Sequence, residues 1–193
     1  MDFSKASEYV IQRLQTELSP DLWYHSPGHT LDVVMATRRL CKVEKVDADA
    51  ALLIETAALY HDAGMIFQYT DHEAKSVTLA RETLPEFGYS PAEIDQISGL
   101  IFATRMPQRV AHLYEQILCD ADLDYLGRND YFIRSYCLRL ELQLTGMKNT
   151  TLKEWINFQV DFLSGHTYFT GSANSLRNEI KRGNLEELKN LLT

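Results

Sequence analysis

The sequence contains few cysteines: only Cys41, Cys119 and Cys137 in 193 residues. They stand far apart and form no CxxC pair, so the sequence offers no disulfide framework. Disulfides persist mainly in oxidising compartments, and this pattern is therefore typical of a reduced protein. We expect three unpaired thiols that serve as small core residues.

Long apolar runs and basic runs are also missing. No run approaches the ~20 residues that a membrane-spanning helix needs, and residues 1–15 are amphipathic and charged, unlike a signal peptide. Asp and Glu outnumber Lys and Arg by 27 to 19, which gives a net charge of −8. We therefore predict a cytoplasmic protein without a membrane partner, and the charge argues against nucleic-acid binding across a broad surface. An acidic protein can still bind a small phosphorylated ligand where a metal ion and a few cations converge.

Alternating β-branched segments, internal repeats and linkers are absent as well. Helical periodicity predicts an all-α chain, a single compact bundle of roughly eight to ten helices. We expect Pro27 and Gly28 to break regular structure just before a helix that starts near His29. The other expected helix starts are Ser4, Asp47, capping boxes at residues 70–73, 90–93 and 151–154, Ser172 or Asn174, and a short final helix restarting at Asn184.

The stretch AALLIETAALYHDAGM, residues 50–65, is the most informative one. Eight of its first ten residues are apolar, which predicts a helix buried on nearly all sides. It ends in His61 and Asp62, and an unpaired charge at a buried helix end would cost several kcal/mol or more, on the order of the transfer cost of an isolated polar group. A divalent metal ion would satisfy the imidazole and the carboxylate together.

Further ligands are available elsewhere in the chain. His29 lies near the start of the second helix, and one aspartate could come from Asp120, Asp122 or Asp124. Imidazole and carboxylate ligands together suit Mn²⁺, Fe²⁺, Co²⁺, Ni²⁺ or Zn²⁺. Two histidines and two aspartates leave coordination positions open, as catalytic metal sites do.

Three motifs in order carry a resemblance to a known family: YHSPGHT at residues 24–30, LYHD at residues 59–62 and DADLDYLG at residues 120–127. Their pattern resembles the HD superfamily of metal-dependent phosphohydrolases, in particular its small stand-alone bacterial members. The resemblance covers about the first two thirds of the chain. It implies one HD-type domain over residues 1–193, with the metal-site core at about 20–127 and a helical extension at about 128–193.

The resemblance also implies a ligand set and a reaction. His29, His61, Asp62 and Asp122 would bind the metal, because the family's aspartate precedes the Leu of the ADL segment. The implied reaction is hydrolysis of a phosphoester or phosphoanhydride by a metal-activated water, which Asp62 could orient or deprotonate. Mg²⁺ joins the possible ions. The substrate class implied by the family is a small phosphorylated compound, in particular a nucleotide.

Several residues have two interpretations. His72 could contact substrate or be an ordinary helix-start residue, and Glu73 fits the capping box of residues 70–73 better than catalysis. Asp120 could orient a ligand histidine or pair with a nearby cation. His25 could line the pocket or lie in a surface loop. The segment 165–170 could form a lid, although packing of an aromatic plug against the C-terminal helices is favoured.

A phosphohydrolase needs cations near the substrate. Arg105 and Arg109 are the first candidates and Lys75 is a weaker one. Dinuclear relatives carry more histidines after the central motif, whereas the segment 98–108 here has none, so we predict one divalent ion. Two alternatives stay open: a cyclic-nucleotide or alarmone phosphodiesterase, and a non-catalytic module that binds metal or nucleotide. The sequence does not indicate an oligomeric state.

Overall fold

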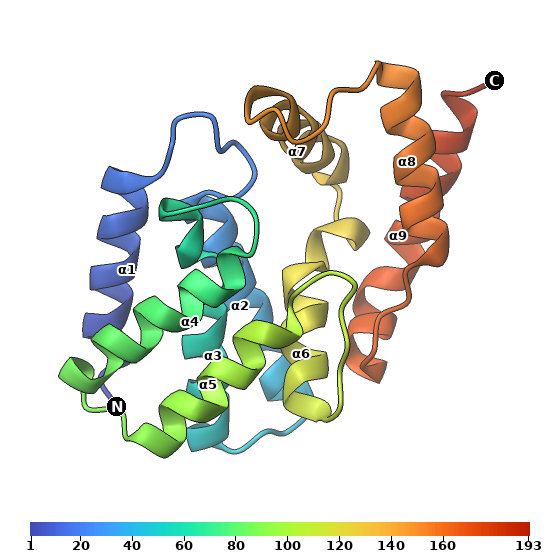
Figure 1. Cartoon of the computed structure of the whole chain (residues 1–193). Helices are drawn as coiled ribbons and strands as arrows, with labels where there is room; N and C mark the ends of the chain where they lie inside the picture. Colours follow the sequence, from blue (N-terminus) through green and yellow to red (C-terminus); the bar gives the residue numbers. More distant parts are fainter. The chain divides into compact units, whose positions relative to one another are not determined.

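The computed structural model describes residues 1–193 and contains nine α-helices, three short 3₁₀ helices and no strand (Figure 1). The predicted all-α class and helix number are confirmed. By its internal contacts the chain forms two compact units: unit 1 contains residues 1–19 and 25–122, and unit 2 contains residues 20–24 and 123–193. That the two act as one domain stays a prediction.

Unit 1 holds six α-helices and two 3₁₀ helices. The α-helices are α1 (Phe3–Glu17), α2 (Pro27–Val43), α3 (Ala48–Tyr60), α4 (His72–Thr83), α5 (Pro91–Ala103) and α6 (Leu113–Asp122), and the 3₁₀ helices are η1 (Ala63–Ile66) and η2 (Leu84–Phe87).

Helix α3 is the centre of unit 1. It packs against α1, α2, α5 and α6, and Ile54, Ala57 and Leu59 have no exposed surface. The predicted helix buried on nearly all sides is therefore confirmed. Asp47 caps it by accepting a hydrogen bond from the Ala50 amide at 2.9 Å. Because α3 is rigidly enclosed, the polar pair at its C-terminal end has little freedom to move.

Unit 2 consists of η3 (Asp124–Gly127), α7 (Tyr131–Leu144), α8 (Leu152–Gly165) and α9 (Gly171–Asn190). Tyr168 is buried inside it and its hydroxyl donates to the Leu123 carbonyl at 3.3 Å. Lys181 donates to the backbone oxygen and to Nδ1 of His166. The segment 165–170 is thus packed within unit 2, as the aromatic-plug alternative expects.

Two of the three predicted capping boxes were correct. The boxes at Ser90 and Thr151 are both formed, with Pro91 at the first position of α5. Four other expectations about helix starts were wrong. Asp2 rather than Ser4 caps α1, through the Lys5 amide. Pro27 does not break the chain but starts α2 behind the N-cap Ser26. Thr170, rather than Ser172 or Asn174, caps the C-terminal helix α9. This helix is continuous and does not restart at Asn184.

The Asn184 prediction was wrong because of a tertiary contact. Its side chain is buried and donates to the carbonyls of Leu126 and Arg128 at 3.0 and 3.1 Å. It therefore cannot cap a new helix, and the backbone of α9 continues through this position.

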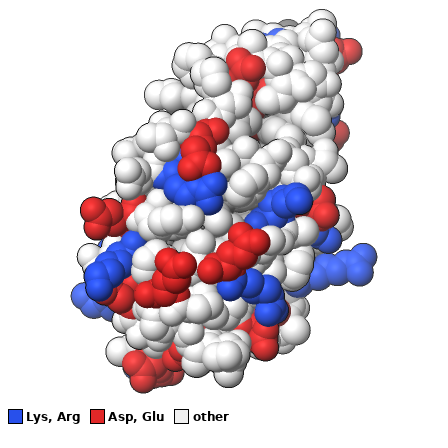
Figure 2. Space-filling view, turned by 60° about the vertical axis from the view of Figure 1, so that its left-hand side comes forward, with Lys and Arg blue, Asp and Glu red and all other residues white.

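Three further observations bear on the predicted environment. All three cysteines are unpaired, as predicted. None of the helices combines the length and the apolar character needed to cross a membrane. On the face shown in Figure 2, basic and acidic side chains are interspersed and form no continuous basic stripe.

Candidate metal centre

Four side chains from three helix ends converge inside unit 1. His29 is in the first turn of α2, His61 and Asp62 directly follow α3, and Asp122 is the last residue of α6. His29, His61 and Asp62 are 6%, 1% and 6% exposed, so the site lies at the edge of the core. These are the four side chains that the sequence proposed as ligands.

The donor atoms are close enough to share one ion. His29 Nε2 lies 3.4 Å from Asp62 Oδ2 and 3.3 Å from Asp122 Oδ1. His61 Nε2 lies 3.0 Å and 3.5 Å from the same two oxygens. Ligands bound to one ion at about 2.1 Å would be separated by about 3.0–3.4 Å at octahedral or tetrahedral angles. The four His–Asp separations match that range. The donor atoms of His29, His61 and Asp122 all lie within 4.8 Å of one another, so these three residues fit a single divalent ion, with Asp62 beside them.

The orientation of the His61 ring supports this assignment. Its Nδ1–H donates to the Ala58 carbonyl at 2.7 Å, which leaves the lone pair of Nε2 facing the two carboxylates. Metal-binding histidines are commonly oriented by such a bond from the other ring nitrogen.

Two buried atoms of the cluster have no hydrogen-bond partner: His61 Nε2 and Asp62 Oδ2. The two atoms lie 3.0 Å apart, as an ion pair when His61 is protonated. A buried polar atom without a partner is costly, typically about 1–3 kcal/mol. An ion bound between these atoms would satisfy both.

Opposite charges shape the electrostatics of the cluster. Burial disfavours protonation of His61, but Asp62 and Asp122 outweigh it and raise the His61 pKa well above its usual value. Burial would likewise raise the pKa of Asp122, yet His29 and His61 lower it to about 2. The two carboxylates are thus anionic. The imidazole nitrogens that bind protons in this cluster are the same atoms that would bind a metal ion.

Comparison with known proteins identifies the family. A family model described as HD domain matches residues 28–124, half of the chain. This chain belongs to the HD domain family. The match begins just before His29 and ends just after Asp122, so it contains all four converging side chains.

Solved structures share the fold over nearly the whole chain. A protein described as a predicted HD superfamily hydrolase from an uncultured Thermotogales bacterium is 19% identical, with a TM-score of 0.66 over 98% of this chain and 90% of its own. Bacillus subtilis YpgQ in complex with ADP is 18% identical, with a TM-score of 0.67 over 99% of this chain and 95% of its own. A Lactobacillus plantarum protein is 17% identical, with a TM-score of 0.69 over 98% and 97%. No curated protein matches the chain.

In this HD domain, His72 lies against the cluster. Its Nε2 is 3.2 Å from Asp62 Oδ1, and its Nδ1–H donates to the Tyr69 carbonyl at 3.0 Å. Burial lowers the pKa of His72, but Asp62 outweighs it, so the pKa is raised from its usual value. His25 lies beside the same ring, with centroids 5.9 Å apart. Both histidines thus lie beside the cluster of His29, His61, Asp62 and Asp122, which we call the HD site.

The expected capping role of Glu73 was wrong. Asp71 is the N-cap residue of α4, has a left-handed backbone (φ 58°), and no side-chain capping bond is formed. Glu73 is instead buried, 3.8 Å from His72 Nε2 and 3.7 Å from Arg105 Nε. It therefore belongs to the polar surroundings of the site.

The candidate substrate cations differ in their placement. Arg105 is paired with Asp71 and lies near Glu73. Lys75 follows His72 by three residues on α4, is exposed, and has no ion pair. Arg109 is exposed, and no ion pair connects it to the four converging side chains.

The two aspartates that flank Asp122 have different surroundings. Asp124 is paired with Arg177 through two hydrogen bonds at 2.7 and 2.9 Å. Asp120 is buried, and its proposed orienting role stays a prediction.

The sequence did not reveal how the HD dipeptide is held. Ser76 Oγ donates to the His61 carbonyl at 2.7 Å and accepts from the Gly64 amide at 2.8 Å. Ser76 follows His72 by four residues, so both lie on one face of α4. The position of Ser76, four residues after His72, was the sequence feature that could have suggested this contact.

Proposed function

We propose that this protein is a metal-dependent phosphohydrolase that acts on a small phosphorylated compound, and that the compound is a nucleotide. The observation that carries the proposal is that each of two imidazole nitrogens lies 3.0–3.5 Å from the same two carboxylate oxygens. The partnerless His61 Nε2 and Asp62 Oδ2 support a metal at this point.

His29, His61, Asp62 and Asp122 would hold one divalent ion. When bound, such an ion supplies a Lewis acid for a phosphoryl oxygen and lowers the pKa of a water molecule toward about 7. Because only these four side chains supply first ligands, positions stay open for water and substrate oxygens.

The remaining roles belong to residues beside the ligands. His72 Nε2 pairs with Asp62 Oδ1 at 3.2 Å and would orient this carboxylate. Asp62 would orient the attacking water or accept its proton, and His72 would hold the carboxylate in position for that role. Lys75 would neutralise substrate phosphate, with Arg105 and Arg109 as further candidates.

The nucleotide part rests on a neighbour. YpgQ has the same fold and is described in complex with ADP. That complex is a property of YpgQ, and it supports testing nucleotides first for this chain.

The test is hydrolysis of an aryl phosphate, nucleoside mono-, di- and triphosphates, a cyclic nucleotide and an alarmone, each with Mn²⁺, Mg²⁺, Co²⁺, Ni²⁺, Fe²⁺ or Zn²⁺. Asp62→Ala removes a ligand and the proton acceptor, so we expect a loss of at least about 10²-fold, the scale of general-base catalysis. Asp49→Ala is the matched control, because Asp49 is exposed on the same helix α3.

Metal content by mass spectrometry separates the alternatives. Full activity and full metal content in Asp62→Ala would contradict the site assignment. If the protein binds metal through His61 but hydrolyses no phosphoester, the proposed hydrolytic activity is wrong, and a module that only binds its ligand is favoured.

A further inference from the structure

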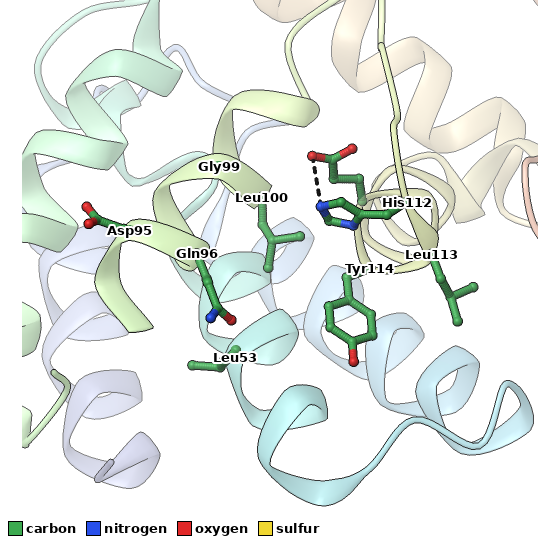
Figure 3. Close-up of a pocket in the computed structure, with 9 residues that line it drawn as sticks. Leu53, Asp95, Gln96, Gly99, Leu100, His112, Leu113 and Tyr114 are labelled. Atoms are coloured by element: carbon green, nitrogen blue, oxygen red, sulfur yellow. Dashed lines mark ion pairs between the residues drawn. The ribbon is translucent and has the colours of Figure 1, made fainter. Parts of the chain in front are cut away.

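A second cavity lies in unit 1, between α5 and the start of α6 (Figure 3). Its volume is ≈ 480 Å³, which is within the range of ligand pockets, about 300–1,000 Å³. Leu53 of α3 lies below it, and α5 and residues 112–115 form its walls. We call it the α5–α6 pocket.

The α5–α6 pocket is separate from the metal centre. Leu53 precedes His61 by eight residues along α3, and Tyr114 precedes Asp122 by eight residues along α6. At 1.5 Å per residue these lining positions are about 12 Å from the ligands on the same helices. None of the four proposed metal ligands lines the pocket.

The pocket has apolar walls and an open position. Leu53 and Leu100 are buried beneath it, and the ring of Tyr114 faces the same space in Figure 3. A Cβ atom built at Gly99 meets nothing within 4 Å, so the absence of a side chain there keeps the pocket open. Flat apolar walls and an aromatic ring favour a planar aromatic ligand.

Two polar groups in the pocket have no partner in the protein: the Gln96 amide and the Tyr114 hydroxyl. Figure 3 shows Gln96 and Tyr114 directed toward the space between α5 and α6. A glutamine amide offers a donor and an acceptor side by side, the pattern that pairs with the edge of a purine base. The pocket could therefore stack an aromatic ring on Tyr114 and form hydrogen bonds from Gln96 to the edge of the same ring.

The charges of the pocket argue against a phosphate. Its carboxylates are Asp95, paired with Arg81 at 2.7 Å, and Glu115, paired with His112 at 3.3 Å. The guanidinium of Arg81 is thus engaged, and a phosphate would face two carboxylates.

We propose that the α5–α6 pocket binds an uncharged planar heteroaromatic molecule of the purine nucleoside class. The inference does not depend on the proposed hydrolysis, because its readout is binding and its residues are distinct from the metal centre.

The experiment is titration of the full chain with adenosine, followed by calorimetry and by amide NMR shifts, in the presence of a chelator. Gly99→Leu adds a side chain at a lining position whose Cβ meets no other atom, and should weaken adenosine binding at least tenfold. The control Gly183→Leu should leave the affinity unchanged, because Gly183 is also helical and open but lies in α9. Gln96→Ala, at an exposed position, should weaken binding severalfold.

Each outcome decides the proposal. Adenosine binding that is lost in Gly99→Leu, with shifts at Gly99 and Tyr114, supports it. No binding at millimolar adenosine, or binding unaffected by Gly99→Leu, overturns it. Adenosine 5′-monophosphate should bind at least tenfold more weakly than adenosine. Equal, Gly99-dependent binding of both would overturn the uncharged ligand class.

Discussion

Gly64 is the position where a single methyl group should disturb the HD site most. A Cβ atom there would lie 1.9 Å from the His72 carbonyl oxygen and 2.6 Å from the Ser76 amide nitrogen. Both are backbone atoms of α4, so no side-chain rotation can relieve the contact. Gly64→Ala must therefore push η1 and α4 apart.

The cost can be estimated from the contacts that change. Overpacking of a core typically costs about 1–3 kcal/mol. Separation of η1 from α4 would also strain the Ser76 bonds to Gly64 and His61, each worth about 1 kcal/mol. We expect a loss of about 3–5 kcal/mol from a total that is typically about 5–15 kcal/mol. For a chain of this size, that corresponds to a fall in Tm of roughly 10 °C.

Urea unfolding followed by circular dichroism measures this loss, and metal content measures the effect on the site. Gly183→Ala is the control, since its Cβ meets nothing in α9 and alanine should stabilise that helix by about 0.5–1 kcal/mol. A Gly64→Ala protein within about 0.5 kcal/mol of the native chain, well below the overpacking cost, would refute the close packing of η1 on α4.

Three further predictions concern metal, pH and unit 2. A chelator should lower the Tm of the native chain by several degrees, because an ion present at a concentration 100 times its Kd stabilises the folded state by about 2.7 kcal/mol. His61→Ala lacks a proposed ligand, so its Tm should not change. Thermal scans in which both proteins respond alike would contradict this. Burial, and after it Lys181, lower the pKa of His166 to about 4. Below about pH 6.5 the unfolded chain therefore binds a proton at this histidine that the folded chain does not, and the free energy of unfolding should fall by about 1–2 kcal/mol between pH 6.5 and 4. Urea unfolding across this pH range should show a smaller fall for His166→Gln. Arg177→Ala should cost about 1–3 kcal/mol by leaving buried Asp124 without its two hydrogen bonds, and an unchanged urea midpoint would count against that pair.

Predictions from the sequence succeeded where the decisive interaction is local. The capping boxes at Ser90 and Thr151 each join residues within one helical turn, so the amino-acid pattern alone determines them. The box expected at residues 70–73 has the same pattern but is not formed. Glu73 there lies near His72 and Arg105 instead, and that arrangement depends on α4 and α5 packing together.

Residue patterns along the chain were enough to predict the all-α class, the buried character of α3 and the chemical nature of the candidate ligands. Periodicity and residue type are properties of the chain and need no neighbour in space. That Asp122 Oδ1 lies 3.3 Å from His29 Nε2 and 3.5 Å from His61 Nε2 follows from tertiary packing, because these residues are far apart in the chain. The packing of α2 and α6 around α3 brings them together. The roles of Ser76 and Gly64 likewise arise from contact between two segments, which no local pattern encodes.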